Sequence, residues 1–173
     1  KINFLEYFWS TSALSAKNEK NLPYYLNKIE IFKEFSEIEL YELVQYTHIR
    51  NFSEGEEILS ENDYGIGFYI ILSGSINVTK NSNKNEDEPL TLYPNMYFGE
   101  KNLLLEKSKC NANFVASDNC KLAAILTPDL DNMIDKKPRV AVKFIKALSK
   151  ISLMRLEEIE KRISSLGKIK HEL

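Results

Sequence analysis

The segment Gly67-Phe-Tyr-Ile-Ile-Leu-Ser-Gly-Ser-Ile-Asn-Val-Thr79 carries the clearest structural signal in this chain. Two candidate strands, Phe68–Leu72 and Ser75–Thr79, lie on either side of the pair Ser73-Gly74. Glycine adopts a positive φ without steric cost, so this pair fits a tight turn between two antiparallel strands. The segment therefore predicts a β-hairpin.

The same strand pattern extends on both sides of this segment. From residue 50 to residue 126, short apolar runs alternate with Gly, Asn, Asp and Ser at intervals of about ten residues, which is typical of an all-β sandwich or barrel. The charge-mixed run Lys80–Glu88 has no apolar residue and is expected to be a solvated hairpin tip without a binding function. The remaining strands are expected at Glu57–Ser60, Leu90–Tyr93, Asn113–Ala116 and Lys121–Leu126.

Helical patterns lie before and after the strands. A helical run at Leu22–Phe35 is followed by Ser36 and Glu39, which form a capping box ahead of a second helix. After the strands, Thr127 is expected to be the N-cap of a short helix with Pro128 at its first position.

A proline then separates two helices. Pro138 should end the short helix near Lys136 and open the longest helix of the chain. This helix is expected to run towards Leu166, with Gly167 as its C-terminal stop. The sequence thus predicts an α+β fold: an antiparallel β-barrel or jelly roll (double-stranded β-helix) flanked by N-terminal helices and a long C-terminal helix.

The chain is expected to have three parts. Residues 1–21 form an N-terminal helical and aromatic extension, residues 22–127 the β-roll with its preceding helices, and residues 128–173 the short and long C-terminal helices. In the extension, Phe4, Tyr7 and Phe8 fit one helical face, which packs on its own domain, on a twin or on a partner. Lys1 is not an initiator methionine, which indicates that a longer chain was trimmed and leaves room for an effector domain.

The long helix carries an apolar stripe at steps of mostly three and four residues. A helix of roughly 30 residues is about 45 Å long, more than a small barrel can cover. We therefore expect one half of the stripe to cover the barrel and the other half to pair with a second copy of the chain. In the alternative, the whole stripe packs within the monomer. The stripe comprises Ile145, Leu148, Leu156, Ile159, Ile163 and Leu166.

Composition excludes several classes of function. The chain has 173 residues, 43% of them hydrophobic, and a formal net charge of -2, which favours one globular domain without a nucleic-acid-binding surface. No apolar run approaches the roughly 18 residues that span a bilayer, so no membrane insertion is expected. No signal peptide is visible in the sequence, and neither Cys110 nor Cys120 has a further His or Cys at metal-ligand spacing. These two observations predict reduced thiols in a cytoplasmic protein. His48 and His171 stand alone, so neither a metal site nor an enzymatic function is expected.

Two further stretches carry the functional signal: Phe98-Gly99-Glu100, and Lys109-Cys110-Asn111-Ala112 about ten residues later. Together with Gly55, Glu56, Asp63 and Gly74 in their order, these stretches resemble the cyclic nucleotide-binding domain family. That family includes catabolite activator-type regulators, protein kinase regulatory subunits and gated channels. The resemblance covers roughly residues 24 to 165.

The resemblance implies a cassette that wraps the ribose and the cyclic phosphate of cAMP or cGMP. In that cassette Gly99 lets the backbone approach the ligand, Glu100 takes the ribose hydroxyl, and an arginine holds the phosphate. The implied binding site consists of Gly99, Glu100, Asn102, Leu103, Lys109, Cys110 and Asn111, with the base near Ile71 and the long helix.

The chain departs from the family at the arginine. Counting forward from Phe98 puts this position at Lys109 or Cys110, and counting back from Ala116 and Lys121 favours Cys110. A guanidinium presents a planar fork to two phosphate oxygens, whereas lysine offers a point charge and cysteine almost nothing. Losing such a contact costs about 1.5 to 3 kcal/mol, or about ten- to hundredfold in affinity.

Other departures concern a carboxylate and two turns. An unpaired Glu100 would repel a phosphate, and its structural role would be to accept backbone N–H bonds.

Asn62 and Asn95 stand where the family has glycine. The turns should survive, because asparagine tolerates left-handed backbone angles.

Two functions remain open. In the first, the chain is a regulatory domain that senses a cyclic nucleotide or another small anion, with weak or lost cAMP and cGMP binding, and moves its C-terminal helix. In the second, it is a ligand-blind dimerisation or protein-interaction module that retains the fold. No cofactor is expected beside such a ligand.

Overall fold

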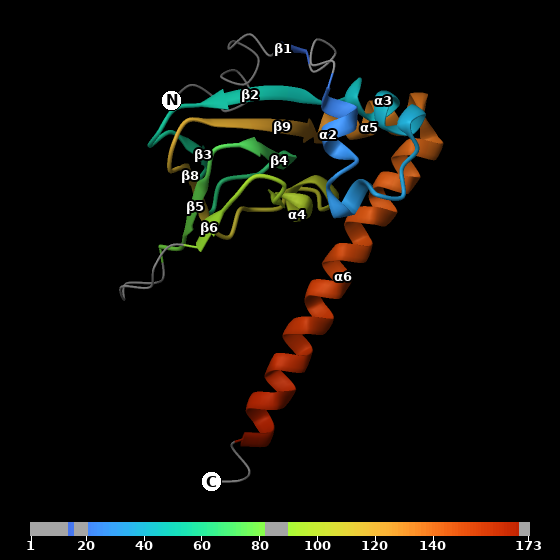
Figure 1. The fold of residues 1–173 in the computed structure, drawn as a ribbon. Helices are drawn as coiled ribbons and strands as arrows, with labels where there is room; N and C mark the ends of the chain where they lie inside the picture. The colour runs from blue at the N-terminus through green and yellow to red at the C-terminus, as the bar shows by residue number, and fades with distance from the viewer. Residues whose placement is uncertain (1–13, 16–20, 82–89, 170–173) are drawn as a thin grey trace.

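The computed structural model describes residues 14–15, 21–81 and 90–169, which form two antiparallel sheets with helices around them (Figure 1). The sheets have the strand orders β1-β2-β9-β4-β7 and β3-β8-β5-β6. This architecture confirms the predicted α+β class. The first sheet contains β1 (Leu14–Ser15), β2 (His48–Phe52), β9 (Cys120–Leu126), β4 (Gly67–Ser73) and β7 (Tyr97–Phe98). The second contains β3 (Glu57–Leu59), β8 (Asn113–Ala116), β5 (Ile76–Thr79) and β6 (Leu90–Leu92).

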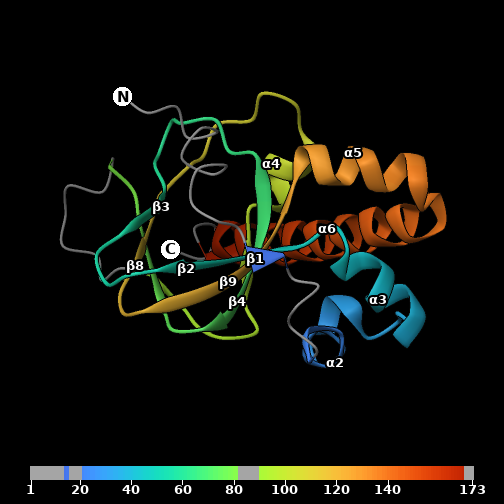
Figure 2. The ribbon, with the colours of Figure 1, turned by 90° about the horizontal axis from the view of Figure 1, so that it is seen from above.

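Helices precede, interrupt and follow the strands (Figure 2). The predicted capping box is confirmed: the Glu39 amide donates to Ser36 Oγ at 3.3 Å, and the Ser36 amide donates to Glu39 Oε2 at 2.8 Å. The helices are α2 (Leu22–Leu26), the 3-10 helix η2 (Glu30–Phe32), α3 (Glu37–Val44), α4 (Glu100–Leu104), α5 (Thr127–Lys136) and α6 (Pro138–Ile169).

The predicted start of α5 is wrong by one residue. Its N-cap is Leu126, whose amide donates to Asp129 Oδ2 at 3.0 Å. The Thr127 hydroxyl instead donates to the Ile66 carbonyl oxygen at 3.1 Å, so this side chain ties α5 to the start of β4 and does not cap the helix.

The proline boundary between the last two helices is confirmed. Helix α5 ends at Lys136 and α6 begins at Pro138. The predicted stop at Gly167 is wrong, because α6 continues through this residue to Ile169. A glycine within a helix costs only about 1 kcal/mol, which is too little to force an end.

The hairpin predicted at Ser73-Gly74 is also wrong, because β4 and β5 belong to different sheets. Gly74 has the expected positive φ of 81°. However, a Cβ at this position would lie 2.6 Å from the Asn119 carbonyl oxygen. The glycine is needed where the chain passes from one sheet to the other, against the turn between β8 and β9.

The core has two layers that meet at β4. Phe68 and Ile70 belong to the apolar cluster that includes the helices, whereas Tyr69 and Ile71 belong to the cluster inside the barrel. This alternation follows from the period of two along a strand. Phe144 of α6 packs on Phe68 with ring centroids 5.7 Å apart. The part of α6 around Phe144 is thereby fixed to β4.

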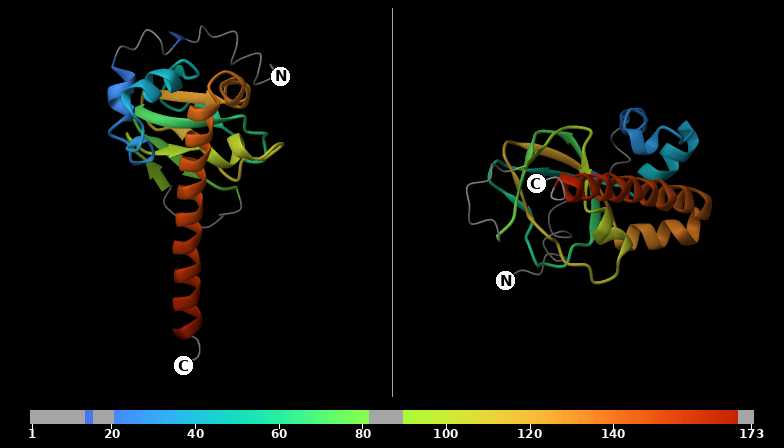
Figure 3. Two further views of the ribbon diagram at one scale, coloured as in Figure 1. Left: turned by 90° about the vertical axis from the view of Figure 1, so that its right-hand side faces the viewer. Right: turned by 90° about the horizontal axis from the view of Figure 1, so that it is seen from below.

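The second part of α6 extends beyond the barrel (Figure 3). Leu148 is 1% exposed, but Leu156, Ile159 and Ile163 are 50%, 54% and 64% exposed. The alternative in which the whole stripe packs within one chain is therefore wrong for these three residues. The Leu166 side chain lies outside the described part of the structure.

Only a short piece of the N-terminal extension is described. Leu14 and Ser15 form β1, in which Leu14 lies opposite Ile49 of β2. The aromatic residues at positions 4, 7, 8 and 9 lie outside the described residues, as does most of the run from residue 80 to residue 88. The strands on either side of that run, β5 and β6, pair with Val78 opposite Leu90, which confirms a hairpin there.

Two further observations concern the cysteines and the possibility of a membrane-spanning helix. Both Cys110 and Cys120 are free thiols. Within residues 14–15, 21–81 and 90–169, no helix combines the length and the apolar character required to cross a bilayer.

Candidate functional site

A left-handed glycine opens the cassette. Gly99 follows β7 with a φ of +86° and precedes α4. A Cβ on this residue would lie 2.3 Å from the Gly67 carbonyl oxygen, a distance that real Cβ atoms do not adopt. Both the backbone angle and the close approach of β4 therefore require glycine here.

This requirement gives a stability prediction with a matched control. Gly55 also has a positive φ, of 78°, but a Cβ there would meet no atom within 4 Å. We expect Gly55→Ala to cost about 1 kcal/mol of unfolding free energy for the left-handed angle alone, and Gly99→Ala about 3 kcal/mol because the clash is added. Urea unfolding of both variants measures the difference. Equal losses would contradict the close contact with β4.

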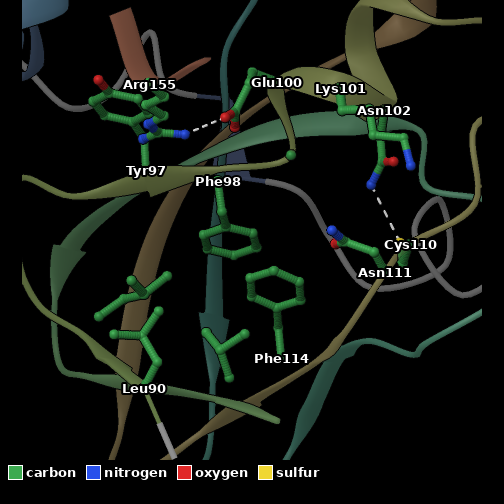
Figure 4. A pocket seen from close by; sticks show the side chains of 13 residues that line it. Leu90, Tyr97, Phe98, Glu100, Lys101, Asn102, Cys110, Asn111, Phe114 and Arg155 are labelled. Atoms are coloured by element: carbon green, nitrogen blue, oxygen red, sulfur yellow. Dashed lines mark hydrogen bonds and ion pairs between the residues drawn. The ribbon is translucent and has the colours of Figure 1, made fainter. Parts of the chain in front are cut away.

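A cavity of about 430 Å³ lies between the cassette, the second sheet and α6 (Figure 4). This volume falls within the range of about 300–1,000 Å³ that is usual for small-molecule sites. The polar side includes Glu100, Lys101, Asn102, Asn111 and Arg155. The apolar wall consists of Val78, Leu90, Leu92, Phe98 and Phe114. An apolar wall facing a few convergent polar groups suits a ligand with one flat apolar end and one charged end.

Glu100 is paired, in contrast to the expectation from the sequence. Arg155 of α6 forms an ion pair with its carboxylate, and the Arg155 guanidinium lies 5.3 Å from the ring centroid of Tyr97 (Figure 4). The Glu100 side chain is only 18% exposed. Arg155 thus neutralises the carboxylate that would otherwise repel an anion.

Cys110 faces the pocket as a neutral group. The Asn102 amide donates to Cys110 Sγ at 3.2 Å, and the Ser108 hydroxyl donates to Asn102 Oδ1 at 3.2 Å. Burial raises the pKa of the Cys110 thiol. At neutral pH this position supplies neither a positive charge nor a forked donor to a ligand.

Lys109 points to a different surface. Its ammonium lies 5.7 Å from the ring centroid of Tyr64, and the residue does not line the pocket. The Cys110 backbone is held from both sides, since its amide donates to the Asp63 carbonyl at 2.8 Å and its carbonyl accepts the Asn62 amide at 2.9 Å.

Five of the eight residues implied by the resemblance line the pocket: Gly99, Glu100, Asn102, Cys110 and Asn111. Leu103 is buried against the helical cluster, and Ile71 is fully buried inside the barrel, so neither faces the cavity. Lys101, Arg155 and the apolar wall were not identified from the sequence. A pocket-facing role for Lys101 could have been sought from its place directly after Glu100, but nothing in the spacing connects Arg155 to the cassette.

The two asparagine turns are confirmed, because Asn62 and Asn95 have φ values of 71° and 72°. His48 lies away from the pocket. Its Nε2 is 3.0 Å from both carboxylate oxygens of Asp129, which links β2 to α5. Among the described residues, no group of three or more His, Cys, Asp or Glu side chains could hold a metal ion.

The sequence is similar to those of known cyclic nucleotide-binding proteins. The family model described as cyclic nucleotide-binding domain matches residues 49–137. Human cGMP-dependent protein kinase 2 is 29% identical over 98 residues, which cover 55% of this chain and 13% of the kinase. The cAMP-dependent protein kinase regulatory subunit of Mucor circinelloides is 27% identical over 111 residues, covering 64% of this chain and 26% of that protein. The chain thus spans only a small part of these relatives.

Solved structures show the same fold. A cyclic nucleotide-binding domain from Methylobacillus flagellatus has a TM-score of 0.72 at 22% identity, with 89% of this chain and 86% of that chain covered. The Thermus thermophilus catabolite activator protein has a TM-score of 0.67 at 25% identity, covering 79% and 62%. The regulatory domain of Toxoplasma gondii PKA, solved with cAMP, has a TM-score of 0.63 at 23% identity, covering 80% and 51%.

The family match covers more than half of the chain and contains the cassette, the strands from β3 to β9 and α5. The matched segment includes Gly99 and Glu100, which open the cassette. The chain therefore belongs to the cyclic nucleotide-binding domain family.

Proposed function

We propose that this chain is a regulatory domain that senses a small anion of the cyclic nucleotide class in the cassette pocket and binds cAMP and cGMP only weakly. The observation that carries this proposal is the buried, neutral Cys110 at the position where the family's arginine would hold the phosphate. Glu100 and Gly99 retain the ribose side of the site. The two free thiols favour a cytoplasmic setting.

The pocket and α6 are coupled through one carboxylate. A ligand hydroxyl that donates to Glu100 competes with Arg155 for the same oxygens. Binding would therefore release Arg155 and allow the second part of α6 to move. This exchange is a two-state element whose equilibrium a ligand can shift.

Calorimetric titration of the unmodified chain with cAMP and with cGMP tests the proposal. We expect dissociation constants weaker than micromolar, since losing a charged bidentate contact costs about 1.5 to 3 kcal/mol. Submicromolar binding of either nucleotide would contradict the weak affinity.

A second candidate function is a ligand-blind module that dimerises or docks a partner. The exposed apolar face of α6 favours it, as does the Arg155–Glu100 pair, which satisfies the carboxylate without a ligand. NMR titration separates the two functions. Absence of any spectral change up to millimolar cAMP and cGMP, in a chain that still self-associates, would favour the module.

A further inference from the structure

We propose that Lys101 is the anion anchor of the pocket, replacing the charge of the absent cassette arginine and selecting a ligand with a single negative charge. This inference rests on the proposed function. It assigns to a residue of α4 the role that the family pattern would place ten residues later in the chain.

The side chains that line the cavity carry a net positive charge. The charged side chains of the cavity are Glu100, Lys101 and Arg155. Arg155 is neutralised by Glu100, so two positive charges and one negative charge leave a sum of one positive charge, which belongs to Lys101. Tyr97 and Cys110 add no charge at neutral pH, because burial raises the pKa of each. A ligand with one negative charge, such as a cyclic phosphodiester, would bring the site to neutrality.

The Lys101 ammonium is available to a ligand anion. Among the described residues no carboxylate pairs with this ammonium, whose hydrogen bond goes to the neutral carbonyl oxygen of Lys109 at 3.1 Å. A ligand oxyanion is a stronger acceptor than a carbonyl, because charge-assisted hydrogen bonds are roughly twice as strong as neutral ones. The ammonium can therefore turn to a ligand at low cost.

The Lys101 ammonium also lies close to the cassette position that lacks the arginine. The bond to the Lys109 carbonyl holds the ammonium beside the residue that precedes Cys110. The positive charge also acts on Cys110 itself, where it lowers the pKa of the thiol against the raising effects of burial and of the Asp63 carboxylate. Lys101 thus delivers its charge to the part of the cassette from which the arginine is missing.

Lys109, the lysine next to Cys110, does not compete for this role. Lys109 lies against the Tyr64 ring and does not line the cavity, although it is adjacent to Cys110 in sequence. An ammonium is a point charge without a planar fork, so an anchor of this kind gives weak, charge-selective binding.

The test is an NMR titration of the 15N-labelled chain with cAMP, which measures millimolar affinities. Lys101→Gln keeps a hydrogen-bond donor for the Lys109 carbonyl but removes the charge. We expect it to weaken cAMP binding about tenfold or more, as loss of a charged contact predicts. Lys101→Arg should bind at least as tightly as the wild type. The matched control Lys109→Gln, which removes the same charge outside the pocket, should leave affinity unchanged.

Salt dependence separates an electrostatic role from a structural one. In the wild type, raising the ionic strength should weaken cAMP binding, whereas in Lys101→Gln this dependence should largely vanish. If Lys101 only braced the cassette, the variant would lose affinity but keep its salt dependence, and the inference would be overturned. Circular dichroism verifies that each variant is folded.

The remaining outcomes distinguish this inference from the proposed function. Equal cAMP affinity of the wild type and Lys101→Gln would overturn the anchor and leave the sensing function intact. If the wild type does not bind but Cys110→Arg does, Lys101 is not an adequate anchor, although the pocket is a nucleotide site. If neither chain binds at millimolar cAMP, both proposals fail together.

Discussion

Cys110→Arg is expected to strengthen cAMP binding about ten- to hundredfold, the energy of one bidentate charged contact. The substitution restores a forked donor at the end of a cassette that retains Gly99 and Glu100. The buried hydroxyl of Tyr69, which lacks a hydrogen-bond partner among the described residues, offers a neutral acceptor near position 110. Isothermal calorimetry of wild type and variant measures the gain.

Two further variants control this experiment. Lys109→Arg introduces a guanidinium one residue away, where the side chain lies over Tyr64 and outside the pocket, so it should bring no gain. Glu100→Ala in the Cys110→Arg background should remove most of the gain, because the ribose hydroxyl loses its acceptor. If Cys110→Arg folds normally by circular dichroism and binds no nucleotide, other residues block the cavity. The interaction-module function would then be preferred.

The unmodified chain is expected to be a homodimer through the second part of α6, and Ile159→Glu with Ile163→Glu should convert it to a monomer. Both side chains are more than half exposed in the single chain, so the substitutions cost little in the monomer. In a dimer they would place unpaired charges in an apolar interface, which is strongly unfavourable. Light scattering should show the mass fall by half.

Lys161→Glu is the matched control. It lies on the opposite side of α6 and changes the net charge by the same amount, since one lysine reverses sign where two isoleucines each gain a negative charge. The control should remain dimeric. A wild type that is already monomeric, or a double variant of unchanged mass, would contradict pairing through this face.

Most strands could be predicted from the sequence because apolar residues recur along them at the positions that are buried in the fold. The run from Phe68 to Leu72 alternates between two apolar layers, and both layers are present in the structure. The pairing of β4 and β5 could not be predicted in the same way. A glycine turn has the same local signature whether the next strand returns to the same sheet or crosses to the other, and the contact with Asn119 that requires Gly74 comes from a distant part of the chain.

The candidate site, too, could be predicted from the sequence only in part. The cassette residues are close in sequence, so a motif could bring Gly99, Glu100 and Cys110 together. Arg155 reaches Glu100 from 55 residues away, and only the path of α6 makes them neighbours. The sequence therefore predicts an unpaired carboxylate at Glu100, whereas in the structure Arg155 neutralises it.

The shape of α6 makes it a mechanical lever. Leu148 is the last fully buried residue of its stripe, Arg155 follows seven residues later, and the helix ends at Ile169. At about 1.5 Å per residue, Arg155 lies about 10 Å from this pivot and the helix end about 32 Å from it. A tilt about Leu148 that moves Arg155 by a given distance would therefore move the far end by about three times as much. A small displacement of Arg155 at the carboxylate of Glu100 would therefore produce a larger displacement of the C-terminal end of α6. A protein bound to that end would detect the displacement.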